Sequence, residues 1–297
     1  MNRYLIFRSD RVGDYLLCAI LIKSIKRNDP HSIIDVVGSK INFLYIKSFN
    51  NVDTVFKLKN GLLNKLNLFY KLNKNKYNVI INHDGKNRSA LMSTLLRSKL
   101  KISNEKNLYK TQIDIILSIL KNLNFDFNES DLNILENRND QNNDLFKFDY
   151  SVLHFDEKWI YDLYIKNYIN IQPTKDELIN LINRIVNKTK MKLILTTGIK
   201  PPDLLNEIFS KNSISNVLFY KNINILELEE VIIKSKLLIS CHGSVSHMAS
   251  AKKIKQIDII DENKLNPYSS WTKHFRNYSP IFRKKFNDLS NDIVNLL

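Results

Sequence analysis

Residues 4–37 read YLIFRSDRVGDYLLCAILIKSIKRNDPHSIIDVV, and this stretch decides the fold. An apolar run at 4–7 is followed by a polar loop at 8–13, and apolar side chains then recur at helical spacing until Pro30. A second apolar run follows at 33–37. Strand, helix and strand in this order predict a βαβ unit with parallel strands and a right-handed crossover.

The same alternation continues through the first half of the chain. We expect strands near 52–58 and 79–81, and helices at 90–96 and 112–123. Asparagine, aspartate and glutamate then dominate 126–149, where apolar residues become sparse. A polar segment of this kind is typical of a domain boundary.

The second half restarts the alternation. A capping box at Thr174 and Glu177 predicts a helix start. Expected strands lie at 151–155, 192–196, 216–219, 237–240 and 254–260, and expected helices follow Pro202 and cover 226–233 and 286–297. The sequence therefore predicts an α/β protein of two Rossmann-like domains, 1–148 and 149–297, that face a central cleft.

Composition limits the class of protein. Apolar residues make up 43% of the 297 and charged residues 25%, which is typical of a folded globular chain. Two cysteines, Cys18 and Cys241, are too few for a disulfide framework and favour a reducing compartment. Residues 1–20 lack the apolar core of a signal peptide, and no uncharged apolar run is long enough to span a bilayer. We therefore expect a cytoplasmic location.

The formal net charge is +15. Residues 1–148 hold 24 basic and 14 acidic side chains, and residues 149–297 hold 21 and 16. Such an excess favours an anionic partner, which is a nucleic acid, a phosphorylated small molecule or an anionic membrane face. The lysines are spread along the chain rather than gathered in one block, so a lysine-rich composition with solvated side chains is an equal alternative.

Ligands of doubly wound sheets bind beyond the carboxyl ends of the strands. We therefore expect chemistry in the loops 8–14, 82–88, 154–159, 197–200 and 241–247. None of them carries the Gly-x-Gly-x-x-Gly fingerprint of dinucleotide-binding proteins, which disfavours a nicotinamide-linked oxidoreductase.

Two interpretations of Asp14 stay open at this point. It falls in the first turn of the expected helix, where the helix dipole stabilises a carboxylate by about 0.3–1 kcal/mol. A carboxylate at the end of a strand can also act as a general base on a hydroxyl group. In the next loop, Lys86 and Arg88 are either contacts for an anionic ligand or solvated charges. Trp159 is expected to pack against the domain core.

Residues 240–249 turn from a strand into a helix with small and polar side chains. Backbone N–H groups and the dipole at such a helix start favour an anion, and Gly243 would let a diphosphate approach closely. His242 and His247 are five residues apart, which does not place them on one helical face, and so no metal site is expected. Cys241 is expected to be a small buried apolar residue.

Four segments resemble, in order, those of the glycosyltransferase family 9 enzymes, the ADP-heptose:lipopolysaccharide heptosyltransferases and their relatives. Residues 8–14 resemble the family's Arg-x-x-x-x-Gly-Asp loop, and 77–90 resemble its Tyr-Asp-x-x-Ile-Asp-x-x-Gly-x-x-Arg-Ser segment. Residues 154–159 are similar to a shortened His-x-x-x-Lys-x-Trp region. Residues 240–251 resemble the Asp-Thr-Gly-x-x-His-x-Ala-x-Ala segment.

The resemblance implies a GT-B fold and an inverting glycosyl transfer without a metal ion or a cofactor. The donor is implied to be a nucleotide sugar, normally ADP-linked, held by the C-terminal domain. Lys158 would contact its phosphates, and Gly243, Ser244 and His247 would form the diphosphate loop. The sugar is implied to be heptose or a related one. His242 stands where the family has aspartate, and this departure leaves another donor sugar as an alternative.

The N-terminal domain would hold the acceptor, with Asp14 as the catalytic base and Arg11, Lys86 and Arg88 as acceptor contacts. An anionic lipopolysaccharide core or another surface glycan fits the charge, and implies peripheral contact with the inner membrane surface. Alternatives are another GT-B enzyme (a sialyl- or Kdo-transferase or an epimerase), an inactive glycosyltransferase, or a non-catalytic anion- or nucleic-acid-binding protein. No RNA-binding, helix-turn-helix or zinc motif supports nucleic acid as a partner.

Overall fold

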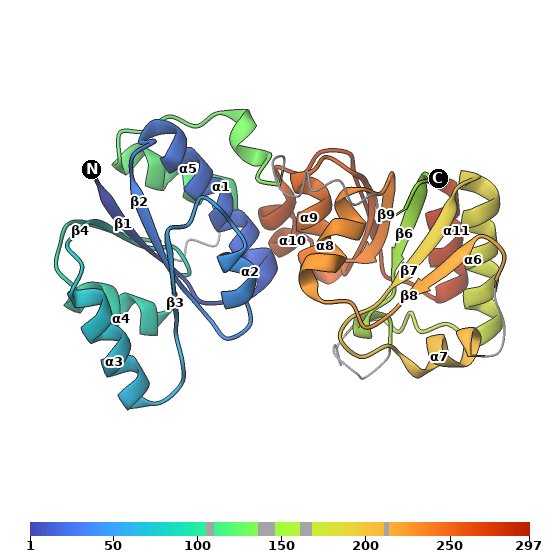
Figure 1. Cartoon of the computed structure of the whole chain (residues 1–297). Coiled ribbons are helices and arrows are strands. Elements are labelled where there is room, and N and C mark those ends of the chain that lie inside the picture. Colours follow the sequence, from blue (N-terminus) through green and yellow to red (C-terminus); the bar gives the residue numbers. More distant parts are fainter. Residues whose placement is uncertain (105–109, 136–145, 161–167, 211–213) are drawn as a thin grey trace. The chain divides into compact units, whose positions relative to one another are not determined.

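The structure is a computed structural model that describes residues 1–104, 110–135, 146–160, 168–210 and 214–297 (Figure 1). The chain forms two compact α/β units, Met1–Ile134 and Leu135–Leu297. The division falls inside the polar segment 126–149, and residues 136–145 of that segment lie outside the described ranges. Each unit is built on one parallel sheet, so the expected α/β class is confirmed.

The first unit contains a five-stranded parallel sheet in the order β3-β2-β1-β4-β5. Its elements are β1 (Arg3–Arg8), α1 (Val12–Asn28), β2 (Ile33–Gly38), α2 (Phe43–Lys47), β3 (Thr54–Lys57), α3 (Leu62–Asn73), β4 (Tyr77–Asn82), α4 (Asn87–Leu95), β5 (Ser98–Ser103), α5 (Gln112–Asn122) and the 3-10 turn η1 (Glu129–Leu132).

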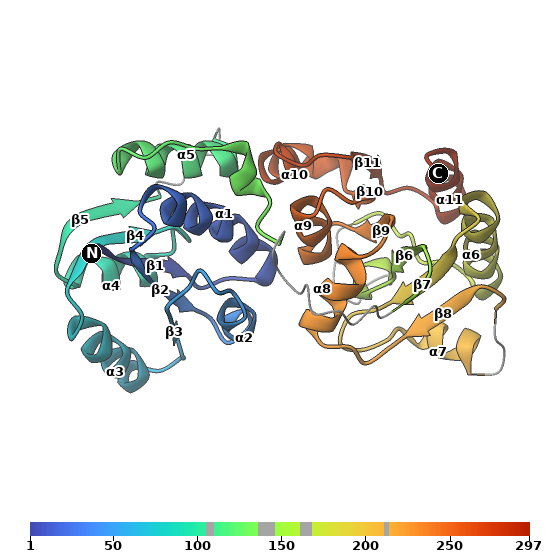
Figure 2. The ribbon, with the colours of Figure 1, turned by 45° about the horizontal axis from the view of Figure 1, so that its top comes forward.

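The sequence explains the centre of this sheet. β1 is apolar at successive positions because helices cover both of its faces, as in parallel sheets generally. Helix α1 packs beside α5 (Figure 2). Leu68 and Leu72 of α3, Met92 of α4 and Leu96, which directly follows α4, lie in a core shared with Leu5 of β1. The helices α3 and α4 therefore cover the same face of the sheet.

The second unit contains a six-stranded parallel sheet in the order β11-β10-β9-β6-β7-β8. Its elements are β6 (Tyr150–His154), η2 (Glu157–Trp159), α6 (Lys175–Thr189), β7 (Lys192–Thr196), α7 (Asp203–Phe209), β8 (Val217–Tyr220), α8 (Ile225–Ile233), β9 (Leu237–Cys241), α9 (Ser244–Ala251), β10 (Lys255–Ile260), η3 (Glu262–Lys264), α10 (Leu265–Thr272), β11 (Tyr278–Phe282) and α11 (Phe286–Asn295).

Trp159 is a core residue, as expected. Its ring is fully buried and stacks on Phe155 with the centroids 5.0 Å apart. Cys241 is also buried, which confirms its expected place in the core. The capping box that was expected at Thr174 and Glu177 is present at the start of α6.

Among the described residues, the helices and strands α2, α3, β5, α10 and β11 were not predicted, and neither were the short 3-10 turns η1, η2 and η3. The strands β5 and β11 are sheet edges, and β11 contains Pro280, a residue that propensity places outside strands. Several leucines of helix α3 are exposed, so its apolar residues do not follow the pattern of one buried helix face. Within the described ranges, no helix combines the length and the hydropathy that a bilayer crossing needs.

Candidate functional site

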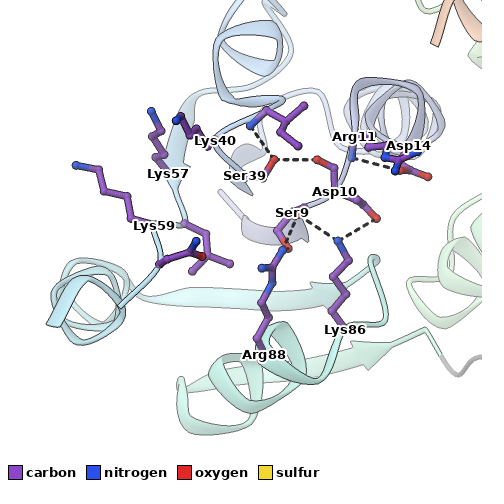
Figure 3. A pocket seen from close by; sticks show the side chains of 13 residues that line it. Ser9, Asp10, Arg11, Asp14, Ser39, Lys40, Lys57, Lys59, Lys86 and Arg88 are labelled. Carbon is purple, nitrogen blue, oxygen red and sulfur yellow. Dashed lines mark hydrogen bonds and ion pairs between the residues drawn. The ribbon is translucent and has the colours of Figure 1, made fainter. Parts of the chain in front are cut away.

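A pocket of about 570 Å³ lies beside the carboxyl ends of β1, β2, β3 and β4 in the first unit (Figure 3). It brings together Asp14, Arg11, Lys86 and Arg88, the base and the acceptor contacts that the sequence predicted for this unit. Its lining residues are Ser9, Asp10, Arg11, Asp14, Ser39, Lys40, Ile41, Lys57, Leu58, Lys59, Asn60, Lys86 and Arg88.

The buried Arg8 side chain contacts both carboxyl groups that line the pocket. Its guanidinium is buried, and its Nε donates to the backbone carbonyl of Asp14 at 2.8 Å. Its Nη1 donates to the carbonyl of His83 at 3.0 Å. The same guanidinium lies 3.3 Å from Asp10 Oδ1 and 3.4 Å from Asp14 Oδ1. One buried positive charge thus contacts two carboxyl groups, Asp10 on the loop between β1 and α1 and Asp14 in the first turn of α1.

Asp14 lies in the first turn of α1, as predicted. Its Oδ2 accepts a hydrogen bond from the backbone N–H of Arg11 at 3.2 Å. The side chain is 36% exposed and lines the pocket, so a ligand can reach its oxygens. The helix-cap interpretation and the catalytic interpretation are compatible, because the carboxylate caps the helix and also faces the pocket.

Asp10 is a second carboxyl group of the pocket, and the sequence analysis did not single it out. Its side chain is only 16% exposed. Burial raises the pKa of Asp10 to about 6, against the lowering effect of the Arg8 guanidinium, and the Asp14 carboxylate adds to the rise. The Lys86 ammonium lies 3.9 Å from Asp10 Oδ2. A proton therefore binds to Asp10 near pH 6.

Lys86 and Arg88 converge on the loop between β1 and α1. Arg88 Nη2 donates to the carbonyl and hydroxyl oxygens of Ser9 at 2.8 and 2.9 Å, and Lys86 Nζ donates to the Ser9 carbonyl at 3.2 Å. Asp84 fixes the two loops against each other, because its carboxylate accepts from the Ser9 N–H and hydroxyl and from the Ser89 hydroxyl.

The remaining cations of the pocket come from the side of β3. Lys57 and Lys59 stand at the end of that strand, and Lys40 follows β2. Ser39 connects the two sides, since its hydroxyl donates to the carbonyl of Asp10 at 2.8 Å. With six cationic side chains and two carboxyl groups in its lining, the pocket carries an excess of positive charge and suits an anionic ligand.

In the second unit, Lys158 lies in a buried ion pair. Its ammonium is 2.6 Å from Asp156 Oδ2. Burial by itself would raise the pKa of Asp156, but Lys158 and a hydrogen bond from His154 hold that pKa well below its usual value. Burial would lower the pKa of Lys158, and Asp156 raises it instead. His154 is oriented by Thr196, whose hydroxyl is 3.0 Å from its Nδ1.

Gly243 makes room for this ion pair. A Cβ atom at position 243 would lie 2.7 Å from Lys158 Nζ, which is closer than real Cβ contacts allow. The structure therefore brings Lys158 and the start of α9 together, as predicted for a diphosphate site. It also shows that the lysine itself fills space beside the glycine.

Asp258 fixes the predicted diphosphate loop through its contacts with His242 and Ser246. This carboxylate is fully buried in β10 and accepts from the Ser246 hydroxyl at 2.7 Å and the Tyr278 hydroxyl at 3.1 Å. Its Oδ2 is also 2.6 Å from His242 Nδ1. Ser246 in turn accepts from the backbone N–H of Gly243 at 3.2 Å. The position where the resembled family has aspartate is thus a histidine that is paired with an aspartate of the next strand.

Aromatic rings surround the two histidines of the loop. The ring of His242 lies parallel to Trp271 at 5.9 Å and edge-on to Tyr268 at 5.0 Å. His247 is buried, and its ring meets His242 at 5.5 Å and Phe275 at 5.1 Å. The predicted contact of His247 with a phosphate oxygen stays a prediction.

Arg283 is a further buried cation that the sequence analysis missed. It follows β11, and its Nη2 donates to the carbonyl of Lys158 at 2.7 Å. Its Nη1 lies 3.7 Å from Cys241 Sγ. The only sequence signal for Arg283, as for Asp156 and Asp258, is a charged residue within or next to an apolar strand. Among the described residues, no group of three or more His, Cys, Asp or Glu side chains is placed to hold a metal ion.

The fold of the two units is the GT-B fold, which glycosyltransferases and UDP-N-acetylglucosamine 2-epimerases share. Escherichia coli heptosyltransferase WaaC with ADP matches over 99% of this chain and 100% of its own, at 11% identity and a TM-score of 0.74. The glycosyl transferase family 9 structure from Veillonella parvula matches over 100% and 90%, at 10% identity and a TM-score of 0.69.

UDP-GlcNAc 2-epimerase from Methanocaldococcus jannaschii is also similar, over 100% of this chain and 92% of that chain, at 14% identity and a TM-score of 0.61. No family model matches the sequence, and no curated protein matches it. At these identities the likeness establishes the fold, which the transferases and the epimerase share.

Proposed function

We propose that the protein is a glycosyltransferase that moves a sugar, heptose or a related one, from a nucleotide-diphosphate donor to an anionic glycolipid or glycan. The observation that carries the proposal is the pocket of the first unit, where the exposed carboxylate of Asp14 lies among six cationic side chains. A carboxylate in this position can take the proton from a hydroxyl group of the acceptor. The cationic side chains beside it can bind the acceptor's negatively charged groups. The similarity to the heptosyltransferases supports the same interpretation.

In the proposed reaction, the acceptor oxygen attacks the anomeric carbon of the donor sugar. The new carbon–oxygen bond forms while the bond to the diphosphate breaks, and the proton of the acceptor hydroxyl passes to Asp14. The products are the glycosylated acceptor and a nucleoside diphosphate, and the configuration at the anomeric carbon is inverted. Arg8 orients Asp14, because its guanidinium contacts the carboxylate and donates a hydrogen bond to the backbone carbonyl of that residue.

The second unit is proposed to bind the donor. The N–H groups at the start of α9, with Ser244 in its first turn, would receive the diphosphate. Lys158 would stabilise the charge of the leaving group, sharing its ammonium between Asp156 and a phosphate oxygen. We propose that these groups suffice without a divalent cation, and that the nucleotide is ADP.

The test is Asp14→Asn. Loss of a general base typically slows a reaction about 10²–10⁴-fold, so transfer from an ADP-sugar to a glycolipid acceptor should fall by that factor. Donor affinity, measured by isothermal titration of the nucleotide, should stay within about twofold, because Asp14 belongs to the other unit. Asp149→Asn, an exposed carboxylate of the second unit, serves as the control. Unchanged turnover in Asp14→Asn would remove the base assignment.

An epimerase is the second candidate, because UDP-GlcNAc 2-epimerases share the fold. The two are distinguished by the need for an acceptor. An epimerase would convert UDP-GlcNAc on its own, whereas the proposed transferase releases nucleoside diphosphate at an appreciable rate only when a glycolipid acceptor is present.

A further inference from the structure

Helix α3 presents most of its apolar side chains to solvent. Only Leu68 and Leu72 of this helix are buried against the sheet. The exposed fractions on the outward side are 72% for Leu62, 82% for Leu63, 54% for Leu66 and 63% for Tyr70. With 3.6 residues per turn these four fall within about one third of the helix circumference, so they form a single apolar stripe.

Helix α4 also exposes apolar side chains. Leu91 and Leu95 are 63% and 60% exposed. Because α3 and α4 pack into one core on the same face of the sheet, their outward sides belong to the same face of the first unit (Figure 1). Large exposed apolar patches on monomeric proteins commonly mark sites of interaction.

The segment of chain that contains these two helices is almost entirely positive in its charged residues. Residues 54–104 contain eleven Lys and Arg residues and one acidic residue, Asp84. That carboxylate accepts hydrogen bonds from Ser9 and Ser89 and is turned into the pocket loops. This segment alone accounts for +10 of the net charge of +15, because it holds only one acidic residue.

We propose that the α3–α4 surface, defined by Leu62, Leu63, Leu66, Tyr70, Leu91 and Leu95, docks on an anionic phospholipid bilayer. An interfacial helix needs an apolar stripe for the acyl boundary and lysines beside it for the headgroups, and Lys65 and Lys71 flank the stripe on its two sides. A second copy of the same surface is a poor partner, because α3 and α4 carry basic side chains and no acidic side chain that could pair with them.

The position of the pocket agrees with this docking. Residues 57–60 line the pocket and lead directly into α3 at Leu62. A bilayer under α3 would therefore bring the mouth of the pocket to the level of the headgroups, where a lipid-anchored acceptor presents its sugars. The docking itself needs neither the donor nor the acceptor, so it can be tested apart from the proposed transfer.

The test is co-sedimentation of the full chain with vesicles. Wild type should bind vesicles of equal phosphatidylglycerol and phosphatidylcholine and stay in solution with pure phosphatidylcholine. The variant Leu62→Gln/Leu63→Gln/Leu66→Gln should lose at least tenfold in partitioning. The variant Lys65→Gln/Lys71→Gln/Lys74→Gln should lose roughly fivefold for each lysine, and added salt should weaken binding of the wild type.

Matched controls separate the surface from general effects. Leu44 is also 72% exposed but lies on α2, and Leu44→Gln should bind as wild type does. The variant Lys121→Gln/Lys175→Gln/Lys188→Gln removes the same charge elsewhere and should retain most of the binding. Circular dichroism melting shows whether each variant is folded.

Three results would overturn the proposal. They are a wild type that does not bind the anionic vesicles, a lysine control that loses as much as the α3 lysine variant, and a leucine variant that binds vesicles normally. In the last case, a shift from dimer to monomer in sedimentation velocity would identify a second copy of the chain as the occupant instead.

Discussion

At the scale of single residues, Asp10 and Asp14 share the Arg8 guanidinium and yet differ in environment. Asp14 is partly exposed and accepts a backbone N–H, whereas Asp10 is nearly buried and has a pKa raised to about 6. The ordinary value for this side chain is 3.8. The folded chain therefore binds a proton at Asp10 in a pH range where the unfolded chain has released it.

This difference predicts how stability depends on pH. Between about pH 4 and pH 6 the folded state holds more protons than the unfolded state, so the free energy of unfolding should fall as pH rises through that window. Asp10→Asn should remove this fall and stabilise the protein at pH 8 by about 1–2 kcal/mol, as measured by urea denaturation at several pH values. The exposed control Asp149→Asn should retain the wild-type slope, and an Asp10→Asn variant that is less stable at pH 8 would contradict the pKa assignment.

At the scale of elements, the start of α9 packs closely against the turn after β6, because residue 243 is a glycine and has no side chain. Gly243 leaves the space that the Lys158 ammonium occupies, and that ammonium is fixed by Asp156 at 2.6 Å. A methyl group at position 243 would therefore displace the buried Lys158 ammonium, which cannot move freely because it is paired with Asp156. The two segments are far apart in the sequence, so no local pattern reveals this fit.

Gly243→Ala should accordingly destabilise the second unit by about 1–3 kcal/mol, the usual cost of overpacking. In a Lys158→Ala background the same change should cost less than about 0.5 kcal/mol, because the space is then open. Gly198→Ala is the matched control, since its Cβ would meet the carboxylate of Glu157 at 2.6 Å, and that side chain is less buried and can move aside. Chemical denaturation measures all four variants, and equal costs for Gly243→Ala in both backgrounds would disprove the fit.

The elements also show what a sequence can predict. The strands β1 and β2 and the helix α1 follow from apolar runs that are buried on both sides. The edge strand β5 alternates lysine with apolar residues and the helix α3 exposes its leucines, so neither has the pattern of a core element. Asp14, Lys86, Arg88 and the 241–247 loop were found because they follow strands, whereas Asp10 depends on burial and Asp258 on contacts across strands.

At the scale of the whole molecule, each unit has its own apolar core. Both tryptophans, Trp159 and Trp271, belong to the second unit, so intrinsic tryptophan fluorescence reports the unfolding of that unit alone. Circular dichroism reports both units. The two signals together can therefore separate the stabilities of the halves.

Leu181→Ala removes a fully buried side chain of α6 and should lower the fluorescence-detected midpoint, at a cost of about 2–5 kcal/mol. Leu5→Ala, equally buried in β1, should shift the circular dichroism transition and leave the fluorescence midpoint nearly unchanged. If both variants moved the fluorescence midpoint equally, the two units would unfold as one.

The edge strand β5 has a consequence for aggregation. A strand at the rim of a sheet offers unpaired N–H and C=O groups to any other chain. On β5 the exposed side chains of Lys99 and Lys101 occupy this rim, and the opposite rim is β3, which is only four residues long. Strand addition by another molecule is therefore disfavoured at both edges of the first sheet. This protects the first unit from fibril formation, although α3 and α4 expose several leucines.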